Sequence, residues 1–161
     1  MPLVSPFPYE PLIDGRQSDR AMMVRRGVQR LMIARRVSVL PELSLASGRR
    51  ADLVCLSEKG EITIVEIKTS IEDFRVDTKW PDYRLHCDKL YFATHPGVPR
   101  EIFPESCGLI VSDGYDAEIL REAEEDKLAP ATRRAMTLRF AKASADRLLN
   151  AEWAANPFFT D

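Results

Sequence analysis

The residues best suited to chemistry lie between Gly48 and Ser70, in the segment GRRADLVCLSEKGEITIVEIKTS. Apolar residues alternate there with a period of two on both sides of a Glu-Lys-Gly turn, which predicts two antiparallel strands joined by a hairpin. Three polar residues, Asp52, Glu66 and Lys68, interrupt this apolar pattern. Two carboxylates and an ammonium are the groups that hold a divalent cation and stabilise charge during phosphodiester hydrolysis.

The hairpin turn decides which residues face each other. A three-residue loop ending at Gly60 gives this glycine the left-handed conformation that a type I turn with a bulge requires. In that register Asp52 lies opposite Glu66, with their Cβ atoms about 5 Å apart, close enough to share one small cation. Lys68 lies on the same face, about 6.7 Å farther along the strand. A four-residue loop would place the two carboxylates on opposite faces.

The predicted donor set favours a hard metal ion. Two carboxylates and the main-chain carbonyl of Ile67 suit Mg²⁺ or Mn²⁺ and leave positions open for water and phosphate oxygens. We therefore expect Asp52, Glu66 and Ile67 to hold the metal, and Lys68 to assist an attacking water. In the alternative interpretation, Glu66 and Lys68 alternate on the solvent face of an edge strand and Asp52 makes a surface ion pair.

Longer stretches of the sequence resemble known families. Asp52, followed by the Glu-x-Lys triplet that starts at Glu66, resembles the signature of the PD-(D/E)xK nuclease superfamily, with Ala51 in place of the proline. The segments GRRADLV, VEIKTS, EDFRVDTKWPDY and CDKLYFAT are similar to the MmcB-like family of DNA-repair proteins, over roughly Val37 to Asp113. The resemblance implies a restriction-endonuclease-like α/β fold, a mixed sheet flanked by helices, and a role in DNA repair.

Composition is that of a globular protein. The 161 residues are 45% hydrophobic, so we expect one nuclease-like domain over residues 1–161. The formal net charge of −2 means that DNA contacts must come from a local basic patch. The three cysteines lack CxxC spacing, which favours free thiols in a reducing compartment. Neither an apolar run of about 18 residues nor a signal peptide is present, so we expect a cytoplasmic protein without membrane contact.

The first 35 residues are expected to contain an arm and a helix. Four prolines in residues 1–16 predict an extended arm, or else a proline-rich ligand for another protein. Ser18 or Asp19 can cap a helix that runs to about Arg35. Four apolar residues should face the sheet: Val24, Val28, Leu31 and Met32. The opposite side carries four polar residues: Arg25, Arg26, Gln29 and Arg30. We predict that Arg26 and Arg30 contact DNA phosphates, and a solvated surface is the alternative.

Residues 37–45 alternate as a strand, with Leu43 and Leu45 on one face and Leu40 and Glu42 on the other. If this strand neighbours the hairpin, Glu42 is a third catalytic carboxylate that reaches the cation directly or through water. Otherwise Glu42 is an exposed edge residue.

Basic and aromatic residues surround the predicted site. Arg49 and Arg50 precede Asp52, where they would clamp a substrate phosphate or only neutralise nearby carboxylates. A short helix over residues 80–87 and a strand over 90–93 follow the hairpin. In the superfamily that this chain resembles, such a helix borders the active cleft, which implies DNA contacts for three residues: Lys79, Tyr83 and Arg84.

The rest of the chain is expected to complete the sheet and cover it. Residues 108–112 read as a buried strand that returns as a second hairpin arm over 115–120. Residues 129–161 are expected to form a long helix and a tail, and Arg133 and Arg134 near the helix start indicate a partner or phosphate contact. Five residues of this helix should face inward: Met136, Phe140, Ala141, Leu148 and Leu149.

The sequence therefore favours a DNA-repair nuclease that depends on Mg²⁺ or Mn²⁺, with DNA as substrate and other repair proteins as candidate partners. A catalytically silent DNA-binding or repair-recruiting module on the same fold is the main alternative. A purely protein-binding domain is a third hypothesis, because the chain has no global positive charge.

Overall fold

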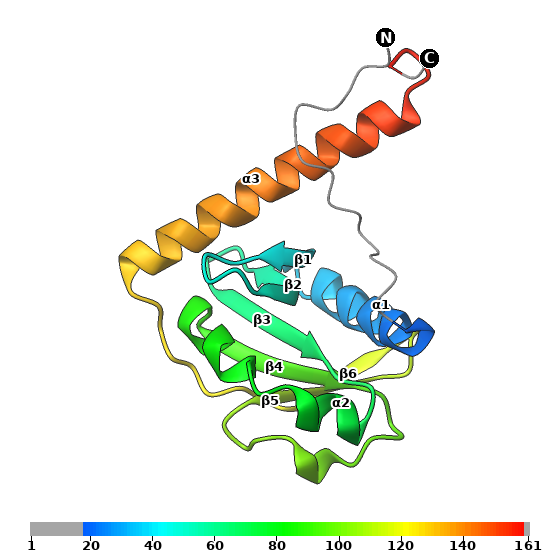
Figure 1. Ribbon diagram of the computed structural model, residues 1–161, viewed down its shortest axis with the longest axis vertical. Coiled ribbons are helices and arrows are strands. Elements are labelled where there is room, and N and C mark those ends of the chain that lie inside the picture. Colours follow the sequence, from blue (N-terminus) through cyan, green and yellow to red (C-terminus); the bar gives the residue numbers. More distant parts are fainter. Residues whose placement is uncertain (1–17, 160–161) are drawn as a thin grey trace.

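The hairpin that carries Asp52 and Glu66 lies inside a six-stranded sheet, in which the strand order follows the sequence (Figure 1). The computed structural model describes residues 18–159, so the predicted arm over residues 1–16 lies outside the described residues. Neighbouring strands from β1 to β3 are antiparallel, β3 to β5 are parallel, and β6 returns antiparallel to β5. The strands are β1 (Ser38–Ser44), β2 (Arg50–Leu56), β3 (Ile62–Ile67), β4 (Lys89–Thr94), β5 (Gly108–Ser112) and β6 (Ala117–Arg121). The predicted mixed α/β sheet is confirmed.

Helical segments flank this sheet. They are α1 (Asp19–Ala34), α2 (Ile71–Val76), α3 (Pro130–Ala155) and the 3-10 segments η1 (Trp80–His86) and η2 (Arg100–Ile102). The Ser18 side chain caps α1 as predicted, because its Oγ accepts a hydrogen bond from the Ala21 N–H at 3.1 Å. Within the described residues, none of the helices combines the length and apolarity that crossing a bilayer would need.

The α1 helix packs on one face of the sheet through the predicted apolar stripe. Val24, Val28 and Met32 are buried there against strand residues such as Leu53. The prediction for Arg25 is wrong, since this residue is buried and not on the solvated side. Its charge lies close enough to those of Glu42 and Asp52 to interact with them, so the buried arc of α1 extends to the acidic residues.

A cluster of aromatic rings holds α2 and η1 against the other face. Phe92 of β4 is central: its ring lies 5.3 Å from Phe74 of α2, 5.4 Å from Trp80 of η1 and 5.4 Å from Phe103. Edge-to-face and stacked contacts of this kind add to the area that the rings bury. They fix the connection between β3 and β4 beside the end of β3, where Glu66 lies.

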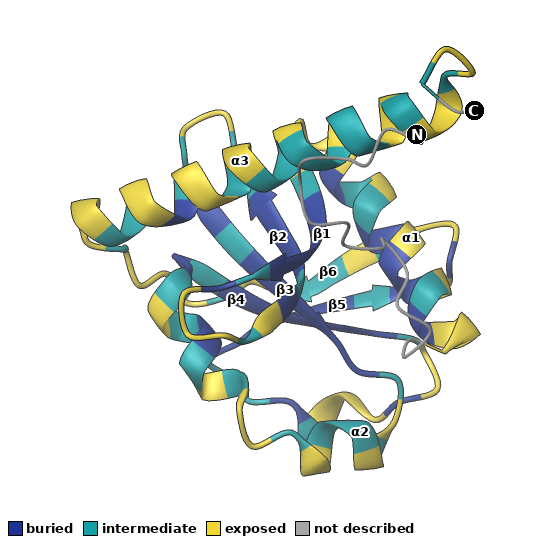
Figure 2. Cartoon of the chain, turned by 45° about the horizontal axis from the view of Figure 1, so that its top comes forward, coloured by how far each residue is buried: buried dark blue, intermediate teal, exposed yellow. Residues whose placement is uncertain are grey.

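The long helix α3 lies over the β1 side of the sheet and extends beyond it (Figures 1 and 2). Met136 is buried, and Phe140 and Ala143 pack on the same core. The prediction that Ala141 and Leu148 face inward is wrong, because both are exposed. The apolar residues of α3 that pack on the core come from its first half, so periodicity alone overestimates its buried face.

The alternation of β1 is interrupted in its middle. Leu40, Leu43 and Leu45 all join the same buried cluster, so the prediction that Leu40 and Leu43 face opposite sides is wrong. The cause is Glu42, whose φ of 53° lies in the left-handed region and rotates the strand by one face.

Candidate active site

The turn between β2 and β3 has the predicted three-residue form. Gly60 has a φ of 83°, and its N–H donates to the Ser57 carbonyl at 3.0 Å. The Ser57 N–H donates to the Glu61 carbonyl at 3.0 Å and closes the loop. The pairing that follows, for example Leu53 with Val65, is the register that places Asp52 opposite Glu66. This prediction is confirmed.

Asp52 and Glu66 are held by each other's strand. The Asp52 Oδ2 accepts a hydrogen bond from the Ile67 N–H at 2.8 Å, and the Glu66 Oε1 accepts one from the Asp52 N–H at 3.0 Å. Burial raises the pKa of Asp52, and the backbone hydrogen bond only partly opposes this effect. Burial, followed by the charge of Asp52, raises the pKa of Glu66 well above its usual range. The pair therefore favours a proton, or another positive charge, between the two strands.

Lys68 lies on the same face and is a fixed cation. Its Nζ donates to the Asp77 Oδ2 at 2.7 Å, and the residue is only 7% exposed. Burial acts to lower the pKa of Lys68, but the hydrogen bond and charge of Asp77 outweigh it, so the pKa is raised. For Asp77 burial acts to raise the pKa, and the bonds from Lys68 and the Lys79 N–H lower it instead. Both members of this pair are therefore charged at neutral pH.

Glu42 is the third carboxylate. The pairs Pro41 with Leu53 and Leu43 with Ala51 flank it, which puts Glu42 beside Asp52 across the β1–β2 boundary. It is 4% exposed, so the alternative of an exposed edge residue is wrong. Its Oε1 is 3.9 Å from Arg50 Nη2.

The other oxygen of Glu42, Oε2, is buried and has no hydrogen-bond partner among the residues that the structure describes. A buried carboxylate oxygen without a partner is costly, so its presence indicates a ligand or a function.

These side chains line one cavity of about 500 Å³ at the end of β3. Its lining includes five acidic and three basic side chains, which leaves an excess of two negative charges when all are ionised. The basic ones are Arg50, Lys68 and Lys79. The acidic ones are Glu42, Asp52, Glu66, Asp73 and Asp77. A cavity with an excess of negative charge attracts cations, and without a bound cation it would bind a phosphate poorly.

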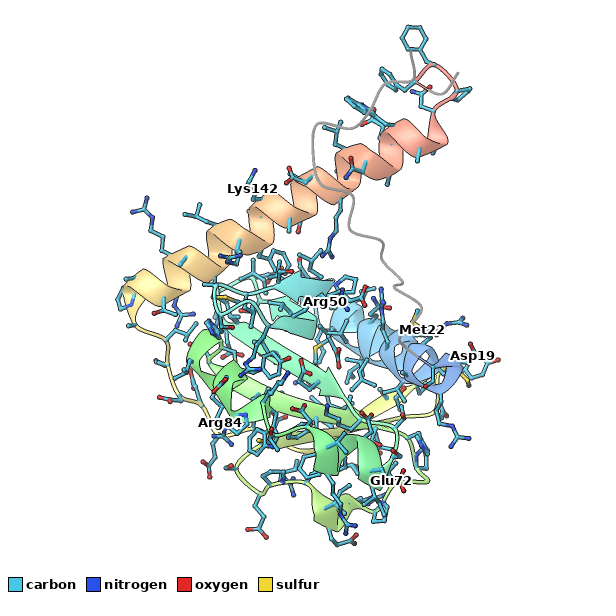
Figure 3. All side chains as sticks on the ribbon, in the orientation of Figure 1. Asp19, Met22, Arg50, Glu72, Arg84 and Lys142 are labelled. Atoms are coloured by element: carbon cyan, nitrogen blue, oxygen red, sulfur yellow. The ribbon has the colours of Figure 1, made fainter. Side chains whose placement is uncertain are left out.

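Three of the residues predicted to contact DNA line this cavity: Arg50, Lys79 and Tyr83. The Tyr83 hydroxyl donates to the Arg50 carbonyl at 3.1 Å, which anchors the start of β2. Burial, and then the charge of Glu66, raises the pKa of Tyr83, so its hydroxyl stays protonated. Figure 3 labels Arg50 at the start of β2, beside β1.

The other four predicted DNA contacts do not line the cavity. Arg49 pairs with Asp82, its Nη2 lying 2.6 Å from Oδ2. Arg84 donates to the sulfur of Cys107 at 3.0 Å and lies over the Trp80 ring, so it contributes to the fold beside η1 (Figure 3). The remaining two predicted contacts, Arg26 and Arg30, are exposed on α1.

Sequence reasoning missed three charged residues of the site. Asp77 and Asp73 follow the hairpin in a charge-rich segment, where nothing in the spacing marks one acid above another. Asp73 Oδ2 accepts a hydrogen bond from the Thr69 N–H at 3.0 Å and so shapes the end of β3. Arg25 was placed on the wrong side of its helix. Only the three-dimensional arrangement of α1 and α2 around the sheet brings these residues to Asp52.

The oxygen donors suit a small, hard cation in type. In residues 18–159, no three His, Cys, Asp or Glu side chains are already drawn together as a metal site. Glu42, Asp52 and Glu66 nevertheless lie side by side across three strands, and Glu42 contributes an unpartnered oxygen. Carboxylate oxygens are the ligands that Mg²⁺ and Mn²⁺ prefer.

The fold and cavity together define a class: an α/β protein with a mixed sheet and a polar, acid-lined cavity at the end of its third strand. Within that class, the chain belongs to the MmcB-like family, since the family model described as "DNA repair protein MmcB-like" matches residues 9–155. This match confirms the resemblance found in the sequence and extends it over most of the chain.

One solved structure that the chain resembles is the "SPO1766 protein of unknown function from Silicibacter pomeroyi". The two chains are 36% identical, with a TM-score of 0.81, and the match covers 90% of this chain and 97% of that one. The comparison with curated proteins gave no match.

Proposed function

We propose that this protein hydrolyses phosphodiester bonds of DNA in a reaction that depends on Mg²⁺ or Mn²⁺. The observation that carries the proposal is the buried pair Asp52 and Glu66, whose pKa values are raised, beside the fixed ammonium of Lys68. A divalent cation would offset the two excess negative charges of the cavity lining. The family's description as DNA repair proteins supports DNA as the substrate.

A restriction-endonuclease-like fold is part of the proposal. Three antiparallel strands are followed by helical segments and a parallel fourth strand, and Asp52 and Glu66 lie on the second and third strands. This arrangement supports the fold that the resemblance to the PD-(D/E)xK superfamily implies.

Each residue has a role that follows from its position. Asp52, Glu66, Glu42 and the Ile67 carbonyl would hold the cation, which, when bound, supplies Lewis-acid stabilisation of phosphate charge and lowers the pKa of water. Lys68 stays protonated because of Asp77, so it acts as a hydrogen-bond donor to a phosphate oxygen or to the attacking water and not as the base.

Two further cations would position the DNA backbone. Arg50 and Lys79 line the cavity near the acidic residues, where a phosphate that approaches a bound cation would meet them. The Tyr83 hydroxyl holds the Arg50 main chain in place.

The proposal is tested with single-stranded, duplex, nicked, flapped and mismatched DNA, each incubated with Mg²⁺ or Mn²⁺. We expect cleavage of at least one substrate by the wild type and none by Asp52→Asn, with DNA affinity nearly unchanged. The matched control is Asp116→Asn, which replaces an exposed aspartate between β5 and β6 and should cleave normally. Absence of cleavage on the whole panel at saturating metal would contradict the proposal.

A second candidate is a DNA-binding or repair-recruiting module without turnover. It is favoured by two basic side chains that already pair with carboxylates and so are less available to a phosphate: Lys68 with Asp77 at 2.7 Å and Arg49 with Asp82 at 2.6 Å. In that case the wild type would bind DNA without cleaving it, and Asp52→Asn would change only the DNA affinity.

A further inference from the structure

Glu42 has a backbone conformation that the rest of the fold must support. Its φ of 53° is left-handed, a region in which the Cβ of a non-glycine residue crowds the following carbonyl. Its carboxylate is buried as well, with Oε2 lacking a hydrogen-bond partner among the described residues. Unfavourable features of this kind persist only where surrounding groups hold them.

Arg147 of α3 contacts the two peptide groups that flank the Glu42 Cα. Its Nη1 donates to the Pro41 carbonyl, and its Nη2 donates to the Glu42 carbonyl at 2.7 Å. Rotation about φ or ψ of Glu42 would move one of these carbonyls away from the planar guanidinium. The fork of one arginine therefore fixes both backbone angles of Glu42, which a single-point ammonium would not do.

The position of α3 makes this contact possible. Met136 and Phe140 pack its first half on the sheet core, and the helix then passes over β1 (Figures 1 and 2). Arg139 also donates to a β1 carbonyl, that of Ser44, at 3.3 Å. The two arginines thus attach the same helix to the same strand, but only Arg147 bonds the peptides on either side of Glu42.

We propose that Arg147 is a positioning residue of the site. It holds Glu42 in the left-handed conformation and so keeps the carboxylate in the cavity beside Asp52. The inference rests on the proposed function, because the ligand that Glu42 then receives is the divalent cation. The helix α3 therefore supports the cation site through Glu42 and is not only a cover for the sheet.

The first test is a calorimetric titration of Mn²⁺ into the full chain. Loss of a residue that orients a metal ligand weakens affinity by roughly tenfold or more, which is the change expected for Arg147→Met. Arg147→Lys keeps the positive charge but lacks the two-pronged guanidinium, so its Mn²⁺ affinity should lie between those of the wild type and Arg147→Met. Arg139→Met is the matched control and should change the dissociation constant less than about twofold, because Ser44 does not touch the site. Equal Mn²⁺ affinities for the wild type and Arg147→Met would overturn the inference.

The second test measures thermal stability and does not need a cation. Glycine adopts a left-handed φ at no steric cost, so Glu42→Gly removes the strain that Arg147 would hold. Arg147→Met should therefore lower the melting temperature at least twice as much in the wild-type background as in the Glu42→Gly background. Equal losses in the two backgrounds would overturn the inference.

The two tests separate the inference from the proposed function. If the wild type binds no Mn²⁺ even with DNA present, the proposed function fails, and the melting temperatures still decide whether Arg147 restrains Glu42. Suppose instead that Mn²⁺ binds, that Arg147→Met leaves its affinity unchanged, and that the melting-temperature losses are equal in the two backgrounds. The cation site then stands and the positioning role of Arg147 is wrong.

Discussion

Replacing Glu66 by glutamine should stabilise the cation-free protein and abolish its stabilisation by divalent cations. Burial and the charge of Asp52 raise the pKa of Glu66 in the folded chain, whereas a glutamate in an unfolded chain ionises near pH 4.3, to about half a unit. The folded state therefore binds a proton more tightly than the unfolded state, so stability falls as pH rises from about 4 toward the folded pKa. Glutamine keeps the oxygen that accepts the Asp52 N–H at 3.0 Å and removes the charge.

The expected magnitude is large enough to measure. Leaving a buried polar or charged group uncompensated costs about 1–3 kcal/mol or more, so Glu66→Gln should gain about this amount above neutral pH without a cation. In a chain of this length 1 kcal/mol moves the melting temperature by roughly 2–4 °C. Mn²⁺ at one hundred times its dissociation constant should stabilise the wild type by about 2.7 kcal/mol and the variant far less.

The assay is calorimetric or fluorescence-monitored thermal unfolding at pH 5, 7.5 and 9, with and without Mn²⁺. When Mn²⁺ is added, the stability of the wild type should approach that of Glu66→Gln. Without Mn²⁺, the difference in stability between the two proteins should grow with pH. Glu72→Gln, in an exposed glutamate of α2, is the control and should follow the wild type in every condition (Figure 3). If Glu66→Gln destabilises the cation-free protein at pH 9, the carboxylate is a structural anion and the reasoning is refuted.

Three further changes test other parts of the structure. Lys68→Met should lower the single-turnover cleavage rate by about a hundredfold while DNA affinity stays within severalfold, since one transition-state donor is lost; parallel losses of rate and affinity would argue for the binding module. Burial acts to raise the pKa of Asp88, but hydrogen bonds, chiefly from Arg133, lower it to about 2. This carboxylate therefore contributes about 2–3 kcal/mol to the free energy of unfolding above pH 4, and the contribution is lost as pH falls toward 2. Asp88→Asn should make the stability less dependent on pH in that window. An unchanged acid transition would contradict this account. A Cβ on Gly108 would lie 2.1 Å from the Tyr91 ring, so Gly108→Ala should cost about 1–3 kcal/mol in urea unfolding; wild-type stability would show that β4 and β5 can separate freely.

The β2–β3 hairpin was predictable because its information is local. Gly60 explains the turn, the turn sets the register, and the register brings Asp52 to Glu66. Each of these steps depends on neighbours in sequence and on the period-two pattern of a strand. The same locality explains why the helix start was predictable to within two candidate caps, Ser18 and Asp19, of which Ser18 makes the bond.

The rest of the site depends on contacts that are distant in sequence. Asp77 pairs with Lys68 only because the aromatic cluster around Phe92 folds α2 back on the sheet. Arg133 near the start of α3 indicated a partner or phosphate contact, but its guanidinium bonds the buried Asp88 at 2.6 Å. No local pattern identifies such partners.

Periodicity also fails where an element covers the sheet incompletely. Leu148 has the spacing of an inward residue but is 71% exposed, and the α3 residues that pack on the core, Met136, Phe140 and Ala143, come from the first half of the helix. Glu42 shows the opposite failure: its left-handed backbone breaks the alternation of β1, and Arg147, which bonds the carbonyls on either side of it, lies about a hundred residues away in the sequence.

The claim on which the others depend is that Asp52 and Glu66 hold a divalent cation. The most direct test is anomalous X-ray scattering from crystals of the wild-type protein grown with Mn²⁺, compared with crystals of Asp52→Asn. The account predicts an anomalous peak in contact with both carboxylates and with Glu42, and its loss in the variant. A wild-type cavity without a peak at saturating Mn²⁺, with the Asp52 and Glu66 hydrogen bonds intact, would contradict it.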